Sequence, residues 1–339
     1  LRLAPTLLGF GLPIVVVDSL LPQVHRDLPG PLETNHIERV FAGDISRKAT
    51  WTQIFAEYSP RILFHLAAET GTSQSMKYSA LHVRSNALGT AMMLDSFSEA
   101  QIRLEKIVLA SSRAVYGEGL WIDSDVGRTF VPGRRLAVDL AAGRWNPLTP
   151  SGKTPNPTAH EAGVTPTNPS SIYGATKLHQ EDLVKIWGEA NGVSGAILRL
   201  QNVYGEGQSP ENPYTGIVNI FHKAAANQRP IQVYEDGQIV RDFIHVDDVC
   251  QALAQAIHIC SPLFPTIDIG SGSSVTIAQI AMQISELYSA PEPEVTGQFR
   301  LGDVRAAFAK NVKMKSMLNV HPKISISEGM ARVKESLSQ

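Results

Sequence analysis

Four short runs rich in valine, isoleucine and leucine recur along the chain, separated by longer segments with helical periodicity. The runs are IVVV at 14–17, RILFHLA at 61–67, KIVLAS at 106–111 and GAILRL at 195–200. A continuous apolar strand is buried on both faces, which is typical of a parallel sheet with helices on each side. The pattern therefore predicts a doubly wound α/β fold of the Rossmann type, with ligands bound at the carboxyl ends of the strands.

Two segments interrupt this alternation. Residues 118–168 are rich in proline, glycine and arginine and too long for an ordinary connection, so they form either a functional loop or an inserted subdomain. Further on, IDIGSGSSVTIAQIAMQISELY predicts a strand, a glycine turn and an amphipathic helix. We therefore predict a Rossmann-like cofactor domain formed by residues 1–201 and 232–267. A smaller α+β domain would be formed by residues 202–231 and 268–339.

The composition excludes several classes of protein. With 339 residues, 43% of them hydrophobic, the chain can bury a large core. A formal net charge of -2 leaves no basic surface for nucleic acid or for a membrane, and no apolar run approaches the roughly 18 residues that span a bilayer. Cys250 and Cys260 fit neither a disulfide framework nor a zinc site. We expect a cytoplasmic protein with no metal, nucleic-acid or membrane partner.

The first apolar run ends in Asp18. In a dinucleotide-binding fold an acid here hydrogen-bonds the ribose hydroxyls and disfavours a 2′-phosphate, so it favours NAD over NADP; a turn aspartate is the alternative. The glycine-rich phosphate loop should lie about 20 residues earlier, before Leu1. Gly9-Phe10-Gly11 follows the first predicted helix, and we interpret it as a helix stop. We expect the first strand and its glycine loop to be missing from this sequence.

Other strand ends carry residues that suit either a cofactor or ordinary packing. Asp44 follows an apolar strand, where it could reach an adenine or lie in a surface turn. Ala67 and Ala68 are small enough for a cofactor to approach closely, or for tight helix packing. Ser111 and Ser112 end a further strand, where a hydroxyl could face a nicotinamide or cap the next turn.

SIYGATK, at 171–177, sets Tyr173 and Lys177 four residues apart. On a helix these side chains lie one above the other, an arrangement that serves either packing or chemistry. Taken alone, the short motif is weak evidence. Its meaning depends on the motifs around it.

In their order along the chain, these motifs resemble the extended short-chain dehydrogenase/reductase family of nucleotide-sugar epimerases and dehydratases. The resemblance covers nearly the whole chain from Ile14 onward and includes VVVD, FHLAA, SSRAVYG, Tyr-x-x-x-Lys, RLQNVYG, RDFIHVDDV and RLGDVR. PQVH, DLAAGRW and QNVYGEGQSPENPYTGI are closer still to one branch of 4-epimerases within the group. The resemblance implies NAD as cofactor, a nucleotide-sugar substrate and a homodimer.

The resemblance also implies a mechanism. Tyr173 would be the general base, and Lys177 would favour its phenolate form and hold the nicotinamide ribose. Ser112 would hydrogen-bond the sugar oxygen. The sugar C4 hydroxyl would lose its proton to Tyr173 and its hydride to NAD, and the 4-keto sugar would turn over before the hydride returns. NAD would therefore stay bound through turnover.

The family positions give two sets of expected binding residues. Those for NAD are Asp18, Asp44, Ile45, Leu66, Ala67, Ala68, Asn86, Tyr173 and Lys177. Those for the substrate are Ser112, Asn202, Arg241, Arg300 and Asp303. Arginine forks suit paired phosphate oxygens, although an Arg-Asp pair such as that in RLGD is more often a surface salt bridge. NPYTG, at 212–216, is expected near the base and the sugar, and nothing separates thymine from uracil.

Departures from the family pattern select the reaction. Related dehydratases have an Asp-Glu pair where this chain has Arg113 and Ala114, and the 3,5-epimerase-reductases have a cysteine close to that position. Simple 4-epimerisation of a dTDP- or UDP-linked hexose or deoxyhexose needs only the residues present. Arg113 itself is either a substrate contact or a surface residue. Two alternatives stay open: a reductase or dehydrogenase acting on nucleotide sugars, and a truncated family member with a degenerate cofactor site.

Overall fold

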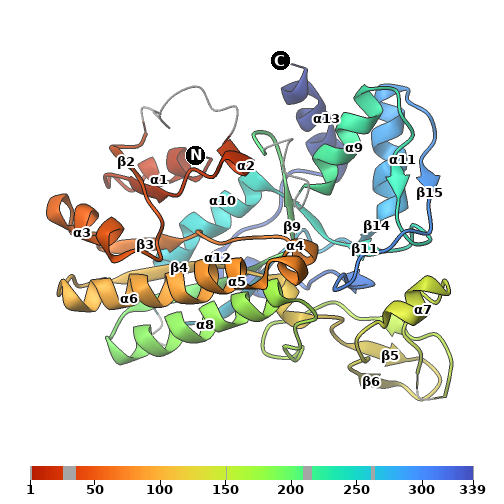
Figure 1. The fold of residues 1–339 in the computed structure, drawn as a ribbon, viewed down its shortest axis with the longest axis horizontal. Coiled ribbons are helices and arrows are strands. Elements are labelled where there is room, and N and C mark those ends of the chain that lie inside the picture. Colours follow the sequence, from red (N-terminus) through yellow and green to blue (C-terminus); the bar gives the residue numbers. More distant parts are fainter. Residues whose placement is uncertain (1, 26–35, 150, 209–215, 261–263, 339) are drawn as a thin grey trace.

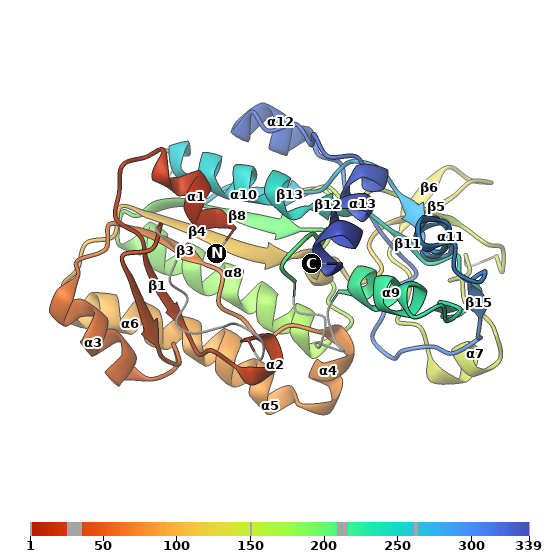
Figure 2. The same cartoon turned by 90° about the horizontal axis from the view of Figure 1, so that it is seen from above.

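The computed structural model describes residues 2–25, 36–149, 151–208, 216–260 and 264–338. The larger part of the molecule is layered, with parallel strands between two sets of helices (Figure 2). The smaller part and the insert lie together at one end of these layers (Figure 1).

The central sheet has four parallel strands in the order β13-β8-β4-β3. Their bounds are β3 (Ile62–His65), β4 (Lys106–Ser112), β8 (Ser194–Leu200) and β13 (Thr266–Ile269). A second sheet pairs β1 (Val15–Asp18) in parallel with β2 (Arg39–Ala42). Each predicted apolar run thus forms a parallel strand, and the predicted α/β class is confirmed. Within the described residues β1 and β3 do not pair, and the missing first strand stays a prediction.

Helices cover both faces of the strands (Figure 2). One face carries α3 (Lys48–Glu57), α6 (Gly89–Glu99) and α8 (Ile172–Ala190). The other carries α1 (Leu3–Leu8), α10 (Val246–Gln255) and α12 (Val312–Leu318). Successive side chains of β4 point to opposite faces, so Ile107 and Leu109 enter one core cluster and Val108 enters the other. This explains the continuous apolar run.

The remaining helices of the larger part are short. They are α2 (Pro22–His25), α4 (Thr72–Lys77), α5 (Ser79–His82), the π-helix η1 (Val83–Leu88), and the 3-10 helices η2 (Arg113–Tyr116) and η3 (Ala256–His258). Helix α1 ends at Leu8, and Gly11 adopts a positive φ of 66°. The expected helix stop at this glycine pair is therefore confirmed.

The smaller part has its own core, which includes Phe221, Ile231 and Ile284. Its helices are α9 (Ile217–Ala226), α11 (Ile277–Tyr288) and α13 (Ile326–Leu337). Its short strands are β10 (Gln232–Val233) paired with β15 (Glu294–Val295), and β11 (Val240–Arg241) between β14 (Val275–Thr276) and β16 (Ala306–Ala307). A parallel pair, β9 (Asn202–Tyr204) with β12 (Phe243–His245), joins it to the larger part.

These pairings bear on the predicted division of the chain. Strands β10 and β11 hydrogen-bond to segments of 268–339, although the predicted boundaries place 232–267 in the cofactor domain. Strand β13 extends the central sheet past that boundary, to Ile269. We therefore propose that the smaller domain includes residues 232–241 and resumes after β13.

The insert, residues 118–168, is a small folded subdomain. Three antiparallel strands, β5 (Trp121–Asp123), β6 (Arg128–Phe130) and β7 (Asn156–Pro157), accompany α7 (Ala137–Ala141). Four buried charges tie it to the smaller part, with Arg135 lying 3.2 Å from Glu118 and 2.8 Å from Glu235. Arg305 completes the group at 3.1 Å from Glu235. Of the two readings left open, the subdomain is correct.

Candidate active site

The amino end of α8 is built to lie against the carboxyl end of β4. Ser171 caps the helix by accepting a hydrogen bond from the Gly174 amide at 3.1 Å. A Cβ on Gly174 would lie 2.4 Å from the Ala114 carbonyl oxygen and 3.1 Å from Pro169. Only glycine permits this approach, and it brings Tyr173, the preceding residue, beside the segment that follows β4.

Replacing Gly174 by alanine is expected to lower the free energy of unfolding by about 1–3 kcal/mol, because backbone must move to admit the methyl group. Chemical denaturation monitored by circular dichroism measures the change. Gly133→Ala is the matched control, since its Cβ would meet no atom within 4 Å. Equal stability of both variants would show that the contact at Gly174 imposes no constraint.

Ser112 and Tyr173 meet at this junction. Ser112 ends β4, is 8% exposed, and its Oγ accepts a hydrogen bond from the Ala114 amide at 3.1 Å. Burial raises the pKa of Tyr173, while a hydrogen bond with the Ser112 hydroxyl and the charge of Arg113 act in the opposite direction. The predicted serine and tyrosine therefore face one another, although they are 61 positions apart by number.

Lys177 lies one turn farther along α8 and is 3% exposed. Its Nζ donates to Gln180 Oε1 at 2.5 Å, and Gln180 Nε2 donates to Thr90 Oγ1 at 2.8 Å and lies 3.0 Å from His65 Nε2. Burial lowers the pKa of Lys177 to about 7, and burial with the nearby Lys177 charge lowers that of His65 to about 3. The Lys177 amine thus contacts Gln180, and its expected roles toward Tyr173 and the nicotinamide ribose stay predictions.

Asn86 is fully buried and links the end of β3 to α8. Its Oδ1 accepts from the Glu69 amide at 2.7 Å, and its Nδ2 donates to the Glu69 carbonyl at 3.0 Å and to Thr176 Oγ1 at 2.9 Å. With these contacts the amide of Asn86 is satisfied by protein. It holds the strand end where Ala67 and Ala68 lie half-buried.

The other predicted NAD residues lie at the ends of β1, β2 and β3. The Asp18 side chain is 40% exposed, and its Oδ1 accepts from the Leu20 amide at 2.8 Å. Asp44 Oδ1 caps the Ser46 amide at 2.8 Å, and the carbonyl of buried Ile45 accepts from the Trp51 indole at 2.8 Å. Leu66 is exposed.

The donors and acceptors at these positions suit NAD. Asp18 offers a solvent-accessible carboxylate at a strand end, and Ala67 and Ala68 leave space at the next parallel edge. Lys177 and Tyr173 supply a cation and a hydroxyl beside the end of β4. This set fits a dinucleotide with an unphosphorylated ribose.

The predicted substrate residues form a second group. Asn202 Oδ1 accepts from Arg113 Nε at 2.8 Å. Arg241 is 3% exposed and donates to Asp303 Oδ1 at 2.6 Å, and to the carbonyls of Val240, Val304 and Arg305. A phosphate would have to displace one of these acceptors.

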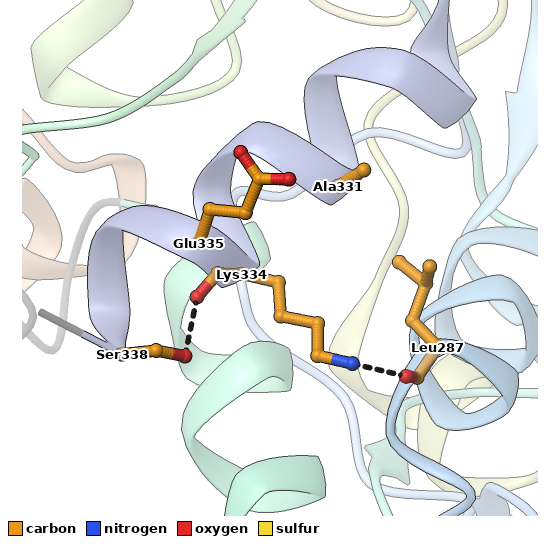
Figure 3. A pocket seen from close by; sticks show the side chains of 5 residues that line it. All are labelled: Leu287, Ala331, Lys334, Glu335 and Ser338. Atoms are coloured by element: carbon orange, nitrogen blue, oxygen red, sulfur yellow. Dashed lines mark hydrogen bonds between the residues drawn. The ribbon is translucent and has the colours of Figure 1, made fainter.

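The last predicted substrate residue, Arg300, is exposed and stacks over Tyr234 at 5.0 Å. Of the predicted segment NPYTG, residues 212–215 lie outside the described part. The pocket drawn in Figure 3, between α11 and α13, contains none of the predicted site residues. It is lined by Leu287, Ala331, Lys334, Glu335 and Ser338.

A buried ionic chain behind the site was not predicted. Glu181 on α8 pairs with Arg199 on β8 at 2.7 and 3.0 Å and accepts from the Ser111 hydroxyl. Arg199 also lies over the Tyr116 ring at 4.7 Å, and Tyr116 donates to Asp268 at 2.7 Å. The one sign of this ionic chain in the sequence is that Glu181 and Arg199 occupy positions that the apolar periodicity predicts to be buried.

Comparison with known proteins gives the family. A family model described as the NAD dependent epimerase/dehydratase family matches residues 2–135 and 148–263. The chain belongs to this family. The prediction of an NAD-dependent member of the nucleotide-sugar epimerase and dehydratase group is therefore confirmed.

The individual relatives include 4-epimerases, in agreement with the branch that the motifs resemble. The chain is 38% identical over 325 residues to the dTDP-L-rhamnose 4-epimerase of Burkholderia thailandensis, covering 96% of this chain and 88% of the relative. It is 26% identical over 336 residues to a UDP-glucose 4-epimerase of Mycolicibacterium smegmatis, covering 98% and 93%. The Thermus thermophilus UDP-glucose 4-epimerase, solved with NAD, shares the fold, with a TM-score of 0.77, 24% identity and coverage of 99% and 94%.

Three further findings, on membrane-spanning helices, metal ligands and cysteines, hold for the part of the chain that the structure describes. There, no helix has the length and apolar character to cross a membrane. No group of three or more metal-ligating side chains is assembled among the same residues. Cys250 and Cys260 are free thiols, the first buried and the second exposed.

Proposed function

We propose that the protein is an NAD-dependent 4-epimerase of a dTDP- or UDP-linked hexose or deoxyhexose. The observation that carries the proposal is the meeting of Ser112 and Tyr173 at one site, beside Arg113 and Ala114. Neither an arginine nor an alanine at those positions can serve as the acid-base pair that a dehydratase needs to eliminate water. The site therefore has the residues that inversion at the sugar C4 needs, and it lacks the acid-base pair that a later elimination of water would need.

Each residue has a separate part in this chemistry. Tyr173 takes the proton of the sugar C4 hydroxyl and returns it when the configuration is inverted. The Ser112 hydroxyl donates to the same sugar oxygen as negative charge develops there. Lys177, already fixed by Gln180, would hold the nicotinamide ribose. When bound, NAD supplies a reversible hydride acceptor for C4.

The cofactor and the substrate would occupy different parts of the molecule. The NAD site would use the nine residues given above for the larger part, and Asp18 would bind its adenosine ribose. The nucleotide diphosphate would lie against the second group, between the larger part and the smaller domain. Asn202 and Asp303 would contact it, Arg241 would exchange one protein acceptor for a phosphate oxygen, and Arg300 would lie at its edge.

The proposal is tested by incubating the protein and NAD with dTDP-L-rhamnose and UDP-glucose, each labelled with deuterium at C4, in ordinary water. We expect a C4-inverted product that keeps the label, with no steady change in NADH absorbance. Loss of the label to water, or no inversion of any nucleotide sugar in a wider panel, would contradict it. NADH changing in proportion to product would identify the alternative reductase or dehydrogenase.

The alternative of a truncated family member with a degenerate cofactor site needs a separate measurement. Nicotinamide released on denaturing the purified chain, counted per protein molecule, reports whether NAD is retained. About one equivalent is expected for an epimerase that keeps its cofactor through turnover. None, even after incubation with NAD, would favour the degenerate cofactor site.

We also propose that the protein is a homodimer that acts in the cytoplasm. The two free thiols support a reducing compartment, and the dimer is expected from the family. Sedimentation analysis of the purified protein would report its mass in solution directly.

A further inference from the structure

We propose that the insert, residues 118–168, positions the arginine that binds the substrate diphosphate, and that Arg135 is the positioning residue. Arg135 does not touch the substrate in this arrangement. It holds the backbone at Asp303, and the segment that begins there holds Arg241. The inference rests on the proposed function, which places the nucleotide diphosphate against Arg241.

The side chain of Arg241 is held mainly by one segment, residues 303–305. Three of its four acceptors among the described residues come from this segment: Asp303 Oδ1 at 2.6 Å, and the carbonyls of Val304 and Arg305 at 2.8 and 3.5 Å. The fourth is the carbonyl of the preceding residue, Val240. Because Arg241 is only 3% exposed, the direction of its guanidinium depends on where residues 303–305 lie.

Three side chains of the insert bind this same segment. Arg135 Nη2 donates to the Asp303 carbonyl at 2.8 Å. At the other end of the segment, the Arg305 amide donates to the Glu118 carboxylate at 3.0 Å, and Arg305 Nε donates to Asn146 Oδ1 at 2.7 Å. Two of these contacts are made to backbone groups, so they fix the path of the chain and not only the conformation of one side chain.

The guanidinium of Arg135 is itself fixed by two carboxylates. Its side chain is 6% exposed, and its Nη1 donates to both carboxylate oxygens of Glu235 at 2.8 and 2.9 Å. Its Nε lies 3.2 Å from Glu118 Oε1. Because the group is planar, these contacts set the direction of the remaining nitrogen, Nη2. Arg135 therefore determines the position of the Asp303 carbonyl.

The arrangement separates the part of Asp303 that is held from the part that can move. The carbonyl is bound by buried Arg135, whereas the side chain is 28% exposed and its carboxylate lies on Arg241. Of the four acceptors of Arg241 given above, this carboxylate is the one that a side-chain rotation can withdraw. A diphosphate oxygen can therefore replace it on Arg241 while the backbone carbonyls keep the guanidinium directed at the ligand.

The test is the affinity of the NAD-saturated protein for dTDP and UDP, measured by calorimetric titration. Arg135→Met is made alone and together with Glu235→Gln, because the single change leaves buried carboxylates unpaired and the double change removes one charge of each sign. In both variants we expect the nucleotide that the wild type binds to bind about tenfold or more weakly. The affinity for NAD should stay within about twofold of the wild type.

Two controls separate positioning from general loosening of the insert. Leu140→Ala shortens a side chain of α7 that is 2% exposed, and it leaves the contacts of Arg135 in place. Arg144→Met removes an insert arginine whose side chain is 56% exposed and pairs with Asp139. Both controls should bind the nucleotide as the wild type does. A loss in Leu140→Ala equal to that in the Arg135 variants would overturn the inference.

A double-mutant cycle shows whether Arg135 acts through Arg241. Arg241→Met alone should weaken nucleotide binding, and adding the changes at Arg135 and Glu235 should weaken it by less than about a further twofold. The same tenfold loss in both backgrounds would overturn the inference, because Arg135 would then act independently of Arg241. So would an unchanged affinity in the Arg135 variants, with circular dichroism showing intact folding.

The binding measurement needs no turnover, so it is separate from the test of the proposed function. A protein that binds dTDP or UDP but epimerises no nucleotide sugar would contradict the proposed function and leave this inference standing. A wild type that binds neither nucleotide would overturn the inference. If the wild type is active, the Arg135 variants should have a raised KM for the nucleotide sugar and a kcat within about twofold, whereas a lowered kcat at unchanged KM would overturn it.

Discussion

Replacing Tyr173 by phenylalanine is expected to lower kcat for C4 epimerisation by about two to four orders of magnitude. The change removes the hydroxyl that takes the substrate proton and leaves the ring that packs on His82 at 6.3 Å. Binding of NAD and of the nucleotide sugar should therefore stay close to wild type. Turnover of the labelled nucleotide sugar, with calorimetric titration of both ligands, measures the two effects.

Tyr58→Phe is a suitable control for this variant, because Tyr58 lies at the end of α3 and its ring packs edge-on against Phe41 of β2. Its kcat should match the wild type. If Tyr173→Phe retained most of the wild-type rate, the hydroxyl could not be the base. If instead both ligands failed to bind, the residue would be structural.

Glu181→Ala should cause the largest loss of stability of any single change considered. The carboxylate holds the Arg199 guanidinium through two hydrogen bonds, and their side chains are only 5% and 8% exposed. Removing one partner leaves a buried unpaired charge, which costs about 3–5 kcal/mol. Urea denaturation followed by circular dichroism would measure the decrease in the free energy of unfolding.

The matched control is Glu189→Ala, an exposed position on the same helix, α8. Its effect should be within about 0.5 kcal/mol. A double variant, Glu181→Leu with Arg199→Met, removes both charges and should recover much of the stability lost by the single change. Similar losses in Glu181→Ala and Glu189→Ala would show that the ion pair contributes little.

The central strands were predictable because burial on both faces leaves a mark along the chain itself. KIVLAS predicts a strand, and its successive residues, such as Ile107 and Val108, fill different core clusters. The amino end of α8 was also predictable, since SIYGATK contains both the cap, Ser171, and the glycine that the close contact requires.

The polar contacts of the site were not predictable in the same way. Glu181 on a helix and Arg199 on a strand form an ion pair, and neither local sequence indicates which residue the other will contact. The contact of Lys177 was unpredictable for a similar reason. Its spacing from Tyr173 sets only the face of the helix, while the neighbour of its Nζ, Gln180, is decided by what that face packs against.

The buried charges between the insert and the smaller domain have a mechanical consequence. Glu118 and Arg135 of the insert, with Glu235 and Arg305 of the smaller domain, have side chains no more than 6% exposed. Parting the two would break the pair of Arg135 with Glu235, and the amide of Ala162, which donates to Asp268 on β13 at 2.7 Å, also binds the insert to the central sheet. The insert therefore acts as a clamp that joins the smaller domain to the end of the parallel sheet.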